Sequence, residues 1–411
     1  MYTDESITDE YYDVVIVGCG VAGLYAALNI DKESRILMIC KEDLAECDSM
    51  LAQGGICVQC DEEDYDAYFE DTLRAGHYEN NRESVDIMIR NSRAILDDLQ
   101  DLGVRFERDA EGNLRYTREG GHSRPRICFH KDITGKEITT ALQKQVLKKE
   151  NITIREHCMM IDLLVEKGRC KGIQAFDKDD HKICIHASDT LLATGGIGGL
   201  YEHSTNYPSL TGDALSVCRH YGIQLDHLDY VQIHPTSLYS KKAGRSFLIS
   251  ESARGEGAIL LNGQGEQFVN ELLPRDVVSQ AIFEEMKKEG SNHVWLSFKN
   301  VDKDTILTHF PNIYQTCLNE GYDITKEPIP VVPAQHYFMG GIHVDSHSHT
   351  TMDHLYAVGE TSCNGVHGKN RLASNSMLES LVFAKRAADH ITACRKGKKA
   401  NESNYDATCC G

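Results

Sequence analysis

The sequence predicts an α/β protein in which a Rossmann-like, dinucleotide-binding domain carries a second, inserted domain. The first observation is residues 13–28, DVVIVGCGVAGLYAAL, where four β-branched residues are followed by glycines and a helix-forming segment. The second is the apolar stretch at residues 35–40, RILMIC, which completes a strand–helix–strand unit of about 30 residues. The third is a change of character between residues 236 and 332, where a hairpin pattern precedes an amphipathic helix at residues 275–288.

The glycines of the first segment, Gly18, Gly20 and Gly23, follow the order G-x-G-x-x-G between the strand and the helix. The first allows a tight turn, the second lets backbone N–H groups approach a diphosphate, and the third lets the helix pack closely on the strand. The positive end of the helix dipole would face the diphosphate. Taken alone, the motif also fits a buried strand and glycine turn that bind no ligand.

Composition excludes several classes of protein. A length of 411 residues favours two domains, and 41% hydrophobic with 26% charged residues is typical of a soluble globular protein. Sixty-two acidic against 43 basic residues give a net charge of −19, which disfavours nucleic acid and anionic membranes as partners. The acidic start is unlike a signal peptide, and the longest apolar run is too short to cross a bilayer, so a cytoplasmic protein is expected.

The fifteen cysteines lack the regular spacing of a disulfide scaffold, and we interpret them as reduced thiols. Cys57 and Cys60 form a single C-x-x-C pair, which does not make a zinc site without a second pair. The sequence therefore predicts no metal site.

The domain boundaries follow from where the strand-and-glycine character stops and returns. The cofactor domain is predicted at residues 1–234 and again at 337–395, and the inserted capping domain at 235–336. Residues 396–411, with KGKK and several Asn and Ser, lack an apolar pattern and are predicted to form a disordered tail.

Ionisable residues next to glycine or proline mark four places in the chain. Arginine forks match carboxylates bidentately, so the substrate class that these places suggest is a small dicarboxylate. The alternative is that they are surface arginines and capped histidines without a site. The clusters contain Glu119 and His122, His234, Arg275 and Asp276, and the pair His336 and Arg371.

Ten motifs in order along nearly the whole chain resemble the succinate dehydrogenase and fumarate reductase flavoproteins. They are DVVIVGCGVAG, AQGGI, TREGGHS, LLATGGIG, QIHPT, LISESARGEGA, LLPRDVVSQAI, PAQHYFMGGI, YAVGE and NRLASNSMLES. TREGGHS is similar to the aspartate-oxidising branch, which carries a glutamate where Glu119 stands, suited to a substrate ammonium. The resemblance implies an FAD-binding Rossmann-like domain with an inserted α+β capping domain, and it places His343, His347, His349 and His354 in a strand and turn rather than a metal site.

The resemblance also implies the contacts of FAD. An acid normally holds the adenosine ribose at the end of the second strand, but Lys41 stands there and fits this family better. Asp48 occupies the place of the histidine that binds flavin covalently in membrane-complex members, so non-covalent FAD is expected. The expected cofactor-binding residues are Gly18, Cys19, Gly20, Val21, Ala22, Gly23, Lys41, Asp48, Ser49, Met50, Leu51, Ala52, Gln53, Gly54, Gly55, Asp213, Glu360, Asn375, Ser376 and Met377.

Around the substrate, the resemblance implies that His234, His336 and Arg371 bind the carboxylates and that Glu119 meets the amino group. Glu251 would lie in the pocket, and Arg275 would be the proton-transfer residue. An arginine is effectively always protonated, so whether Arg275 acts as a base or mainly supplies positive charge stays open.

The function implied is FAD-dependent oxidation of L-aspartate to iminoaspartate, the entry to quinolinate and NAD synthesis. Fumarate or oxygen would accept the electrons, and quinolinate synthase is a candidate partner. Two alternatives are a soluble fumarate reductase or succinate dehydrogenase flavoprotein, which Glu119 disfavours, and a catalytically silent flavin-binding protein. Members of this branch commonly continue into a C-terminal helical domain, which this sequence is expected to lack.

Overall fold

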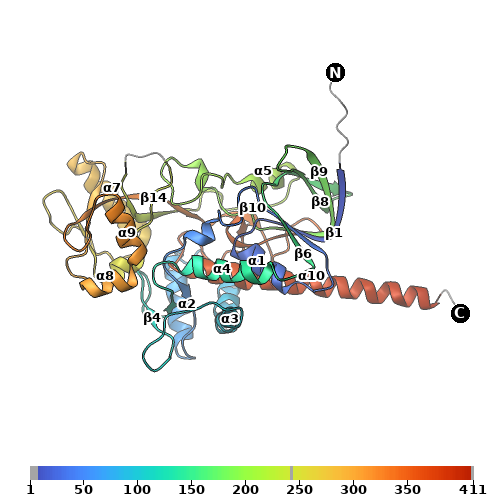
Figure 1. The fold of residues 1–411 in the computed structure, drawn as a ribbon, viewed down its shortest axis with the longest axis horizontal. Helices are drawn as coiled ribbons and strands as arrows, with labels where there is room; N and C mark the ends of the chain where they lie inside the picture. Colours follow the sequence, from blue (N-terminus) through green and yellow to red (C-terminus); the bar gives the residue numbers. More distant parts are fainter. Residues whose placement is uncertain (1–7, 241–243, 409–411) are drawn as a thin grey trace, which may run out of the picture.

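The computed structural model describes residues 8–240 and 244–408. A central sheet holds the cofactor-binding part, with strands in the order β6-β2-β1-β9-β8-β7 and β16 beside β9 (Figure 1). The strands are β1 (Thr8–Val17), β2 (Ile36–Ile39), β6 (Ile152–Arg155), β7 (Met159–Glu166), β8 (Arg169–Phe176), β9 (Lys182–Leu192) and β16 (Leu355–Ala357).

The parallel core of this sheet is formed by β1, β2 and β9, as the buried strands of the sequence predicted. Val14 pairs with Ile36 and Val17 with Ile39, and β9 runs parallel to β1 on its other side. Val14 is completely buried and Val17 is 6% exposed, because helices cover one face of the sheet and a second hydrophobic cluster covers the other. All three strands therefore deliver their carboxyl ends to one edge of the sheet.

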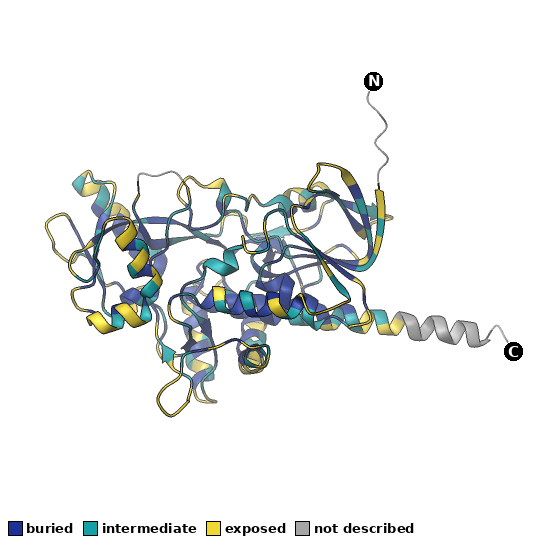
Figure 2. Ribbon diagram, viewed as in Figure 1, coloured by how far each residue is buried: buried dark blue, intermediate teal, exposed yellow. Residues whose placement is uncertain are grey.

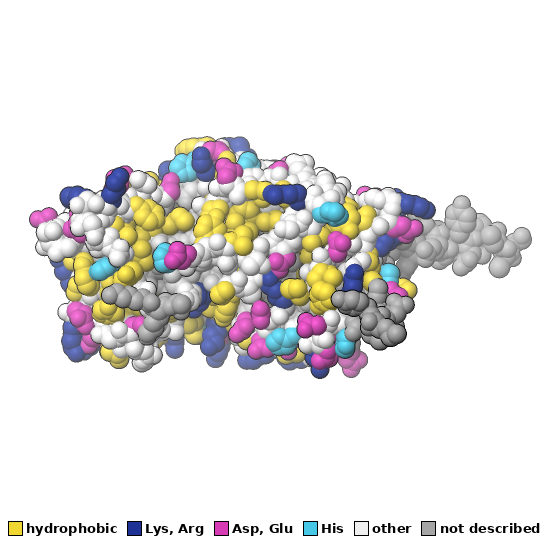
Figure 3. Space-filling model, turned by 90° about the horizontal axis from the view of Figure 1, so that it is seen from above, with side chains coloured by type: hydrophobic (Ala, Val, Ile, Leu, Met, Phe, Trp, Pro, Cys, Tyr) yellow, Lys and Arg dark blue, Asp and Glu magenta, His cyan; other side chains and the backbone are white. Residues whose placement is uncertain are grey.

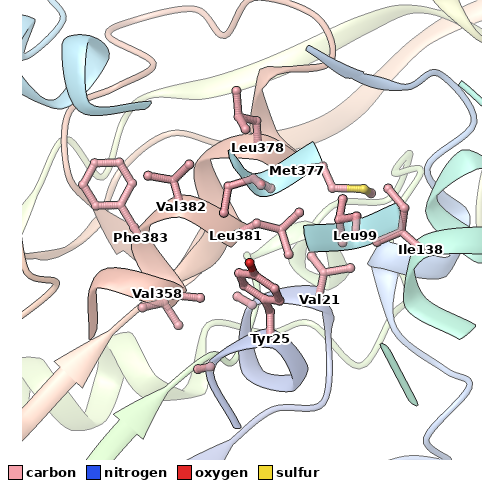
Figure 4. Close-up of a cluster of buried hydrophobic side chains, with 14 of the residues drawn as sticks. Val21, Tyr25, Leu99, Ile138, Val358, Met377, Leu378, Leu381, Val382 and Phe383 are labelled. Atoms are coloured by element: carbon pink, nitrogen blue, oxygen red, sulfur yellow. The ribbon is translucent and has the colours of Figure 1, made fainter. Parts of the chain in front are cut away.

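Helices α1 (Val21–Asn29), α3 (Arg82–Asp101), α4 (Thr134–Val146) and α10 (Asn375–Thr408) pack on one face of the sheet. Figure 2 shows α1 buried along most of its length, since α10 and the sheet enclose it. Figure 4 shows the contact, in which side chains of α1 and α10 meet those of α3 and α4. This packing fixes the position of the N-terminus of α1. The labelled side chains are Val21, Tyr25, Leu99, Ile138, Val358, Met377, Leu378, Leu381, Val382 and Phe383.

The inserted region has an antiparallel sheet in the order β11-β14-β13-β12 and a hydrophobic core of its own. β11 and β14 run between the two parts of the protein, and the predicted boundaries at 234/235 and 336/337 fall within them. Its elements are β11 (Val231–Leu238), α6 (Glu251–Gly255), β12 (Ile259–Leu261), α7 (Arg275–Glu289), β13 (Val294–Ser297), α8 (Lys303–His309), α9 (Pro311–Asn319) and β14 (Ile329–Phe338). We call this region the cap.

Short elements complete the cofactor part. Two small sheets have the orders β3-β5-β4 and β10-β15-β17. The remaining elements are β3 (Ile56–Cys57), α2 (Asp64–Ala75), β4 (Tyr116–Thr117), β5 (Ile127–Cys128), α5 (Asp213–His220), β10 (Leu225–Asp226), β15 (Gly341–His343) and β17 (Ser362–Cys363), with 3-10 turns at Asp48–Leu51, Gly198–Leu200 and Gly359–Thr361.

Helix α10 continues to Thr408, whereas the sequence pattern placed the end of the ordered domain at residue 395 and a disordered tail at 396–411. The difference has a physical reason: Lys, Ala and Glu favour the helix, and a helix already nucleated by packing extends at little cost. Residues 409–411 of the predicted tail lie outside the described part.

Among the described residues, none of the helices combines the length and apolarity needed to cross a bilayer. On the face seen in Figure 3, acidic and basic side chains are interspersed, so the field over it is mixed in sign.

Candidate active site

A large cavity opens where the carboxyl ends of β1, β2 and β9 meet the cap. Its empty volume is about 1790 Å³, open solvent included. One end is lined by the glycine turn after β1 and by Ala193, Thr194 and Gly195 after β9. The other end is lined by ionisable side chains, several of them from the cap. The crevice beyond the carboxyl ends of parallel strands is where open α/β sheets bind ligands.

The glycine end has the shape and the donors that a diphosphate requires. Gly18 has φ +112°, and a Cβ on it would lie 2.0 Å from the carbonyl oxygen of Ala193. Gly20 precedes α1, whose first turn contains no acidic residue. The N–H of Val21 donates to Ser49 Oγ at 3.1 Å. The positive end of α1 therefore faces the cavity without an acid to neutralise it.

Two buried acids face the same cavity. Burial raises the pKa of Asp48 to about 7. Burial and the neighbouring Asp48 raise the pKa of Glu360 to about 8. Asp48 Oδ1 accepts the N–H of Tyr207 at 2.9 Å, but Oδ2 is buried with no partner among the described residues. A bound ligand with polar edges would satisfy that oxygen, so the cradle and the donor set fit FAD.

At the outer wall of the cavity, Lys41 pairs with Asp213 through an Nζ to Oδ2 distance of 2.6 Å. Thr211 Oγ1 lies 3.4 Å from the same ammonium. The pair joins the end of β2 to the start of α5, so it fixes the rim of the cofactor end.

At the ionisable end, His234 and Arg371 present hydrogen-bond donors that have no acceptor among the described residues. His234 Nδ1 accepts the N–H of Thr236 at 3.2 Å, so the proton of the neutral ring is on Nε2, which is buried and unpartnered. Arg371 donates through Nη1 to Ser376 Oγ at 2.7 Å and lies 4.3 Å over the ring of Tyr337, while its Nε is unpartnered. Buried donors without acceptors are what a carboxylate ligand would satisfy.

This end of the cavity is electropositive. Burial, together with the cations Arg275 and Arg371, holds the pKa of His336 well below its usual value, and the pKa of His234 is lowered in the same way. Burial and then Arg275 lower the pKa of Arg371 to about 10, which leaves it charged at neutral pH. Neutral imidazoles next to arginines therefore offer both hydrogen bonds and positive charge to an anionic substrate. His336 is held in place by Thr205, with Nδ1 2.7 Å from Oγ1.

Arg275, in the first turn of α7, is fixed by two partners. Its Nε lies 2.5 Å from Glu251 Oε2, and its Nη1 donates to Gln232 Oε1 at 2.9 Å. Arg254 Nη2 lies 3.6 Å from the same Glu251 oxygen. Burial acts to raise the pKa of Glu251, but Arg275 and Arg254 outweigh it, so the pKa is lowered and the carboxylate is ionised. Gln232 also donates to the carbonyl oxygen of Arg371 at 2.7 Å, which links the two arginines.

Glu119 is a second carboxyl group in this end of the cavity, which is rich in arginine and histidine. Its side chain is buried, Oε1 accepts from Ser252 Oγ and Oε2 accepts from Ser374 Oγ, both at 2.6 Å. Burial and the nearby Glu251 raise the pKa of Glu119. A Cβ on Gly54 would lie 2.6 Å from Glu119 Oε1, so the glycine makes room for the carboxyl group.

The structure brings the six predicted catalytic residues together around this cavity, although they come from distant segments. Most of the predicted cofactor residues also line it. Three do not: Gly23 packs on the carbonyl oxygen of Gly18, Met50 Sδ lies 3.9 Å from Thr140 Oγ1, and Asn375 accepts from Tyr68. Those that line it are Gly18, Cys19, Gly20, Val21, Ala22, Lys41, Asp48, Ser49, Leu51, Ala52, Gln53, Gly54, Gly55, Asp213, Glu360, Ser376 and Met377.

Sequence reasoning missed several lining residues. The LLATGGIG motif did indicate the glycine turn after β9, but Asn206 and Arg245 stand in segments with no cofactor signal of their own. Gln232 and Arg254 lie inside the motifs QIHPT and ARGEGA, yet only the structure shows that they hold Arg275 and Glu251.

Comparison with known proteins identifies the family. The family model described as "FAD binding domain" matches residues 13–377, so the chain belongs to this FAD-binding family of flavoproteins, as its motifs suggested. Among solved structures, the chain superposes on E. coli quinol fumarate reductase FrdA with a TM-score of 0.88 and 30% identity, covering 94% of this chain and 71% of that one. Sdh1 of Mycobacterium smegmatis gives a TM-score of 0.80 with 29% identity over 94% of this chain and 70% of that one.

Within this class, the chain belongs to the L-aspartate oxidase family. The L-aspartate oxidase of Clostridium perfringens is 53% identical over 380 residues, 92% of this chain and 86% of that protein. That of Clostridium acetobutylicum is 47% identical over 96% of this chain and 91% of its own length. The chloroplastic enzyme of Oryza sativa is 39% identical over 93% of this chain and 63% of its own length.

Proposed function

We propose that this protein oxidises L-aspartate to iminoaspartate with FAD as its cofactor. Membership of the L-aspartate oxidases supports the reaction. The observation that carries the substrate is Glu119, a buried carboxyl group at the end of a cavity whose other ionisable groups include arginines and histidines. A dicarboxylate without an amino group has no use for that acceptor, whereas the ammonium of aspartate does.

Binding would use donors that the protein leaves unpartnered. His234 Nε2 and the Arg371 guanidinium donate to the substrate carboxylates, with His336 beside them. Because these groups are buried, each charge-assisted hydrogen bond is stronger than it would be in water. Glu119 accepts from the ammonium and so orients the α-carbon.

Bound FAD would supply the acceptor for the hydride of the α-carbon. The glycine turn after β1 and the N-terminus of α1 would hold its diphosphate, and Asp48 and Glu360 would contact its polar edges. Asp48 offers no imidazole for a covalent bond, so we propose non-covalent attachment.

Arg275 is paired with the ionised Glu251 and presents its guanidinium to the cavity. Oxidation of aspartate removes a hydride from carbon and a proton from nitrogen. This half-reaction therefore does not need Arg275 to take a proton from carbon. When fumarate reoxidises the flavin, a hydride and a proton both add to carbon, and Arg275 would deliver the proton.

The proposal extends to the cellular role. Iminoaspartate would enter quinolinate and NAD synthesis, fumarate or oxygen would reoxidise the flavin, and quinolinate synthase is the candidate partner that would take the product. A cytoplasmic location is part of the same proposal.

The second candidate, a soluble fumarate reductase or succinate dehydrogenase, is favoured by the structural likeness to FrdA. The two candidate functions differ in the substrate that reduces the flavin. The holoprotein is mixed anaerobically with L-aspartate or with succinate while the flavin absorbance is followed. Bleaching by aspartate alone supports the proposal, bleaching by succinate alone supports the second candidate, and no bleaching by either indicates a silent flavin-binding protein.

A further inference from the structure

A second, much smaller pocket lies between the cap and the cofactor part, on the other side of Ser252. Its empty volume is about 230 Å³, open solvent included, and its interior has room for about one water molecule. It is lined by Thr117, Phe129, Lys131, Ser252, Glu256, His309 and Phe310. Thr117, Ser252, Glu256 and His309 bring polar groups to the lining, and a water molecule needs such partners.

Ser252 stands between this pocket and the active-site cavity. Its hydroxyl donates to Glu119 Oε1 at 2.6 Å, and Glu119 lines the large cavity while Ser252 lines the small pocket. Ser250 fixes the serine from behind, since its Oγ accepts the Ser252 N–H at 3.2 Å and lies 3.2 Å from the Ser252 hydroxyl. The side chain therefore bridges a buried carboxyl group and a site open to water.

The far wall of the small pocket carries ionisable side chains that are partly exposed to solvent. Glu256 Oε1 lies 3.4 Å from His309 Nδ1, and these side chains are 32% and 18% exposed. Arg115 Nη2 lies 3.2 Å from His309 Nε2, and Lys131 completes the charged rim. A proton that reaches the water position is thus next to both a carboxylate and the bulk.

The proposed reaction needs such a route. When aspartate becomes iminoaspartate, a C–H bond gives up a hydride to the flavin and an N–H bond gives up a proton. Glu119 is the acceptor at the nitrogen, and it is only 3% exposed. With substrate and cofactor filling the large cavity, the proton on Glu119 has to leave by another path before the next turnover.

We propose that Ser252 relays the amino proton of the substrate from Glu119 to the small pocket. The Ser252 hydroxyl turns so that its oxygen accepts the proton of the Glu119 carboxyl group while its own hydrogen passes to a water molecule that the pocket has room to hold. One O–H bond forms on Ser252 and one breaks, Glu119 returns to a carboxylate, and the proton leaves to Glu256 or to bulk water. No electrons move in this step, and it rests on the proposed function.

Ser374 provides the matched control. Its hydroxyl donates to the other Glu119 oxygen at the same distance of 2.6 Å, but Ser374 also accepts the N–H of Gly55 and lies on the side of the large cavity. Ser252→Ala and Ser374→Ala therefore each remove one hydrogen bond from Glu119, and only the first interrupts the path to the small pocket.

The test is anaerobic stopped-flow of the FAD-loaded protein, with flavin reduction by L-aspartate and reoxidation of the reduced flavin by fumarate measured separately. Fumarate carries no amino group, so the relay is not needed in that half-reaction. Ser252→Ala should slow reduction by aspartate about 10-fold or more, leave fumarate reoxidation within about twofold, and slow reduction more than Ser374→Ala does. Ser252→Thr, which keeps the hydroxyl, should restore the rate.

Equal slowing by Ser252→Ala and Ser374→Ala would mean that Ser252 only holds Glu119, and equal loss in both half-reactions would mean general damage to the site; either result overturns the relay. If Ser252→Ala does not fold, Ser252→Val is compared with Ser252→Thr, because the two side chains have the same shape and only threonine carries a hydroxyl. A wild-type protein that fumarate reoxidises but aspartate does not reduce would overturn the proposed function itself, and the relay with it.

Discussion

Arg275 and Glu251 form a buried ion pair in the wall of the cavity, with Arg275 Nε 2.5 Å from Glu251 Oε2. Gln232 holds the guanidinium from a second side. A bond to the carboxylate and a bond to the neutral amide oxygen of Gln232 together fix the guanidinium plane, so its positive charge points at one place in the cavity. Arg254, 3.6 Å from the same carboxylate, is a second cation beside Glu251.

Replacing Arg275 should therefore abolish chemistry without releasing the flavin. Arg275→Leu is expected to lower turnover about 1000-fold, because it removes a preorganised charge from a buried site. FAD content should be normal, since the glycine end of the cavity is untouched. Turnover and the flavin-to-protein ratio are measured beside Arg105→Leu, which changes an exposed arginine paired with Glu137. Near-normal turnover of Arg275→Leu would contradict the role given to this pair.

Alanine substitutions at two glycines of the turn after β1 should have different effects, one on folding and one on FAD binding. Gly18→Ala forces a Cβ to 2.0 Å from the Ala193 carbonyl oxygen at a φ of +112°, so the variant should lose folded protein. Gly20→Ala meets only Ser49 Oγ at 3.1 Å, so it should fold but bind FAD about 10-fold more weakly because the Cβ enters the diphosphate site. Circular dichroism and FAD titration distinguish the outcomes. Wild-type FAD affinity in Gly20→Ala would place the diphosphate elsewhere.

Glu379 predicts a pH-dependent difference in stability. Its pKa is raised from 4.5 to about 7 by burial, although Asn364 donates to it. A raised folded-state pKa means that its stabilising protonated form is fully present below pH 4.5 and is lost as the pH rises toward 7. Glutamine does not titrate, so Glu379→Gln keeps its free energy of unfolding while that of the wild type falls. The difference in favour of the variant should grow to about 3 kcal/mol between pH 4.5 and 7 and then level off. Thermal melts from pH 4.5 to 8 measure it; a constant difference would refute the assigned burial.

The parts of the fold that the sequence predicts are those specified locally. A run of β-branched residues followed by G-x-G-x-x-G determines β1, the turn and α1 within one segment, and the structure has them at Thr8–Val17 and Val21–Asn29. The inserted cap was also predicted from its change of character. The end of α10 was not predicted. Packing nucleates the helix, and the polar residues that follow have a composition that fits either a continuing helix or a disordered tail.

The site shows the same division. Motifs predicted Glu119, Arg275 and Arg371, but the network that orients them joins segments more than a hundred residues apart. Ser252 beside Glu119 is an example, since nothing in LISESARGEGA indicates that this serine faces TREGGHS. Such contacts depend on how the cap lies against the cofactor part, which no local pattern encodes.

The central claim is that Glu119 recognises the amino group of aspartate. The most direct measurement is the rate of anaerobic flavin reduction by L-aspartate in wild type and in Glu119→Gln, with reoxidation by fumarate measured on the same samples. Gln keeps the size of the side chain and an acceptor oxygen but loses the charge that meets the ammonium. We predict that reduction by aspartate falls about 100-fold or more while reoxidation by fumarate stays within about threefold of wild type. Unchanged reduction by aspartate, or an equal fall in both half-reactions, would contradict the account.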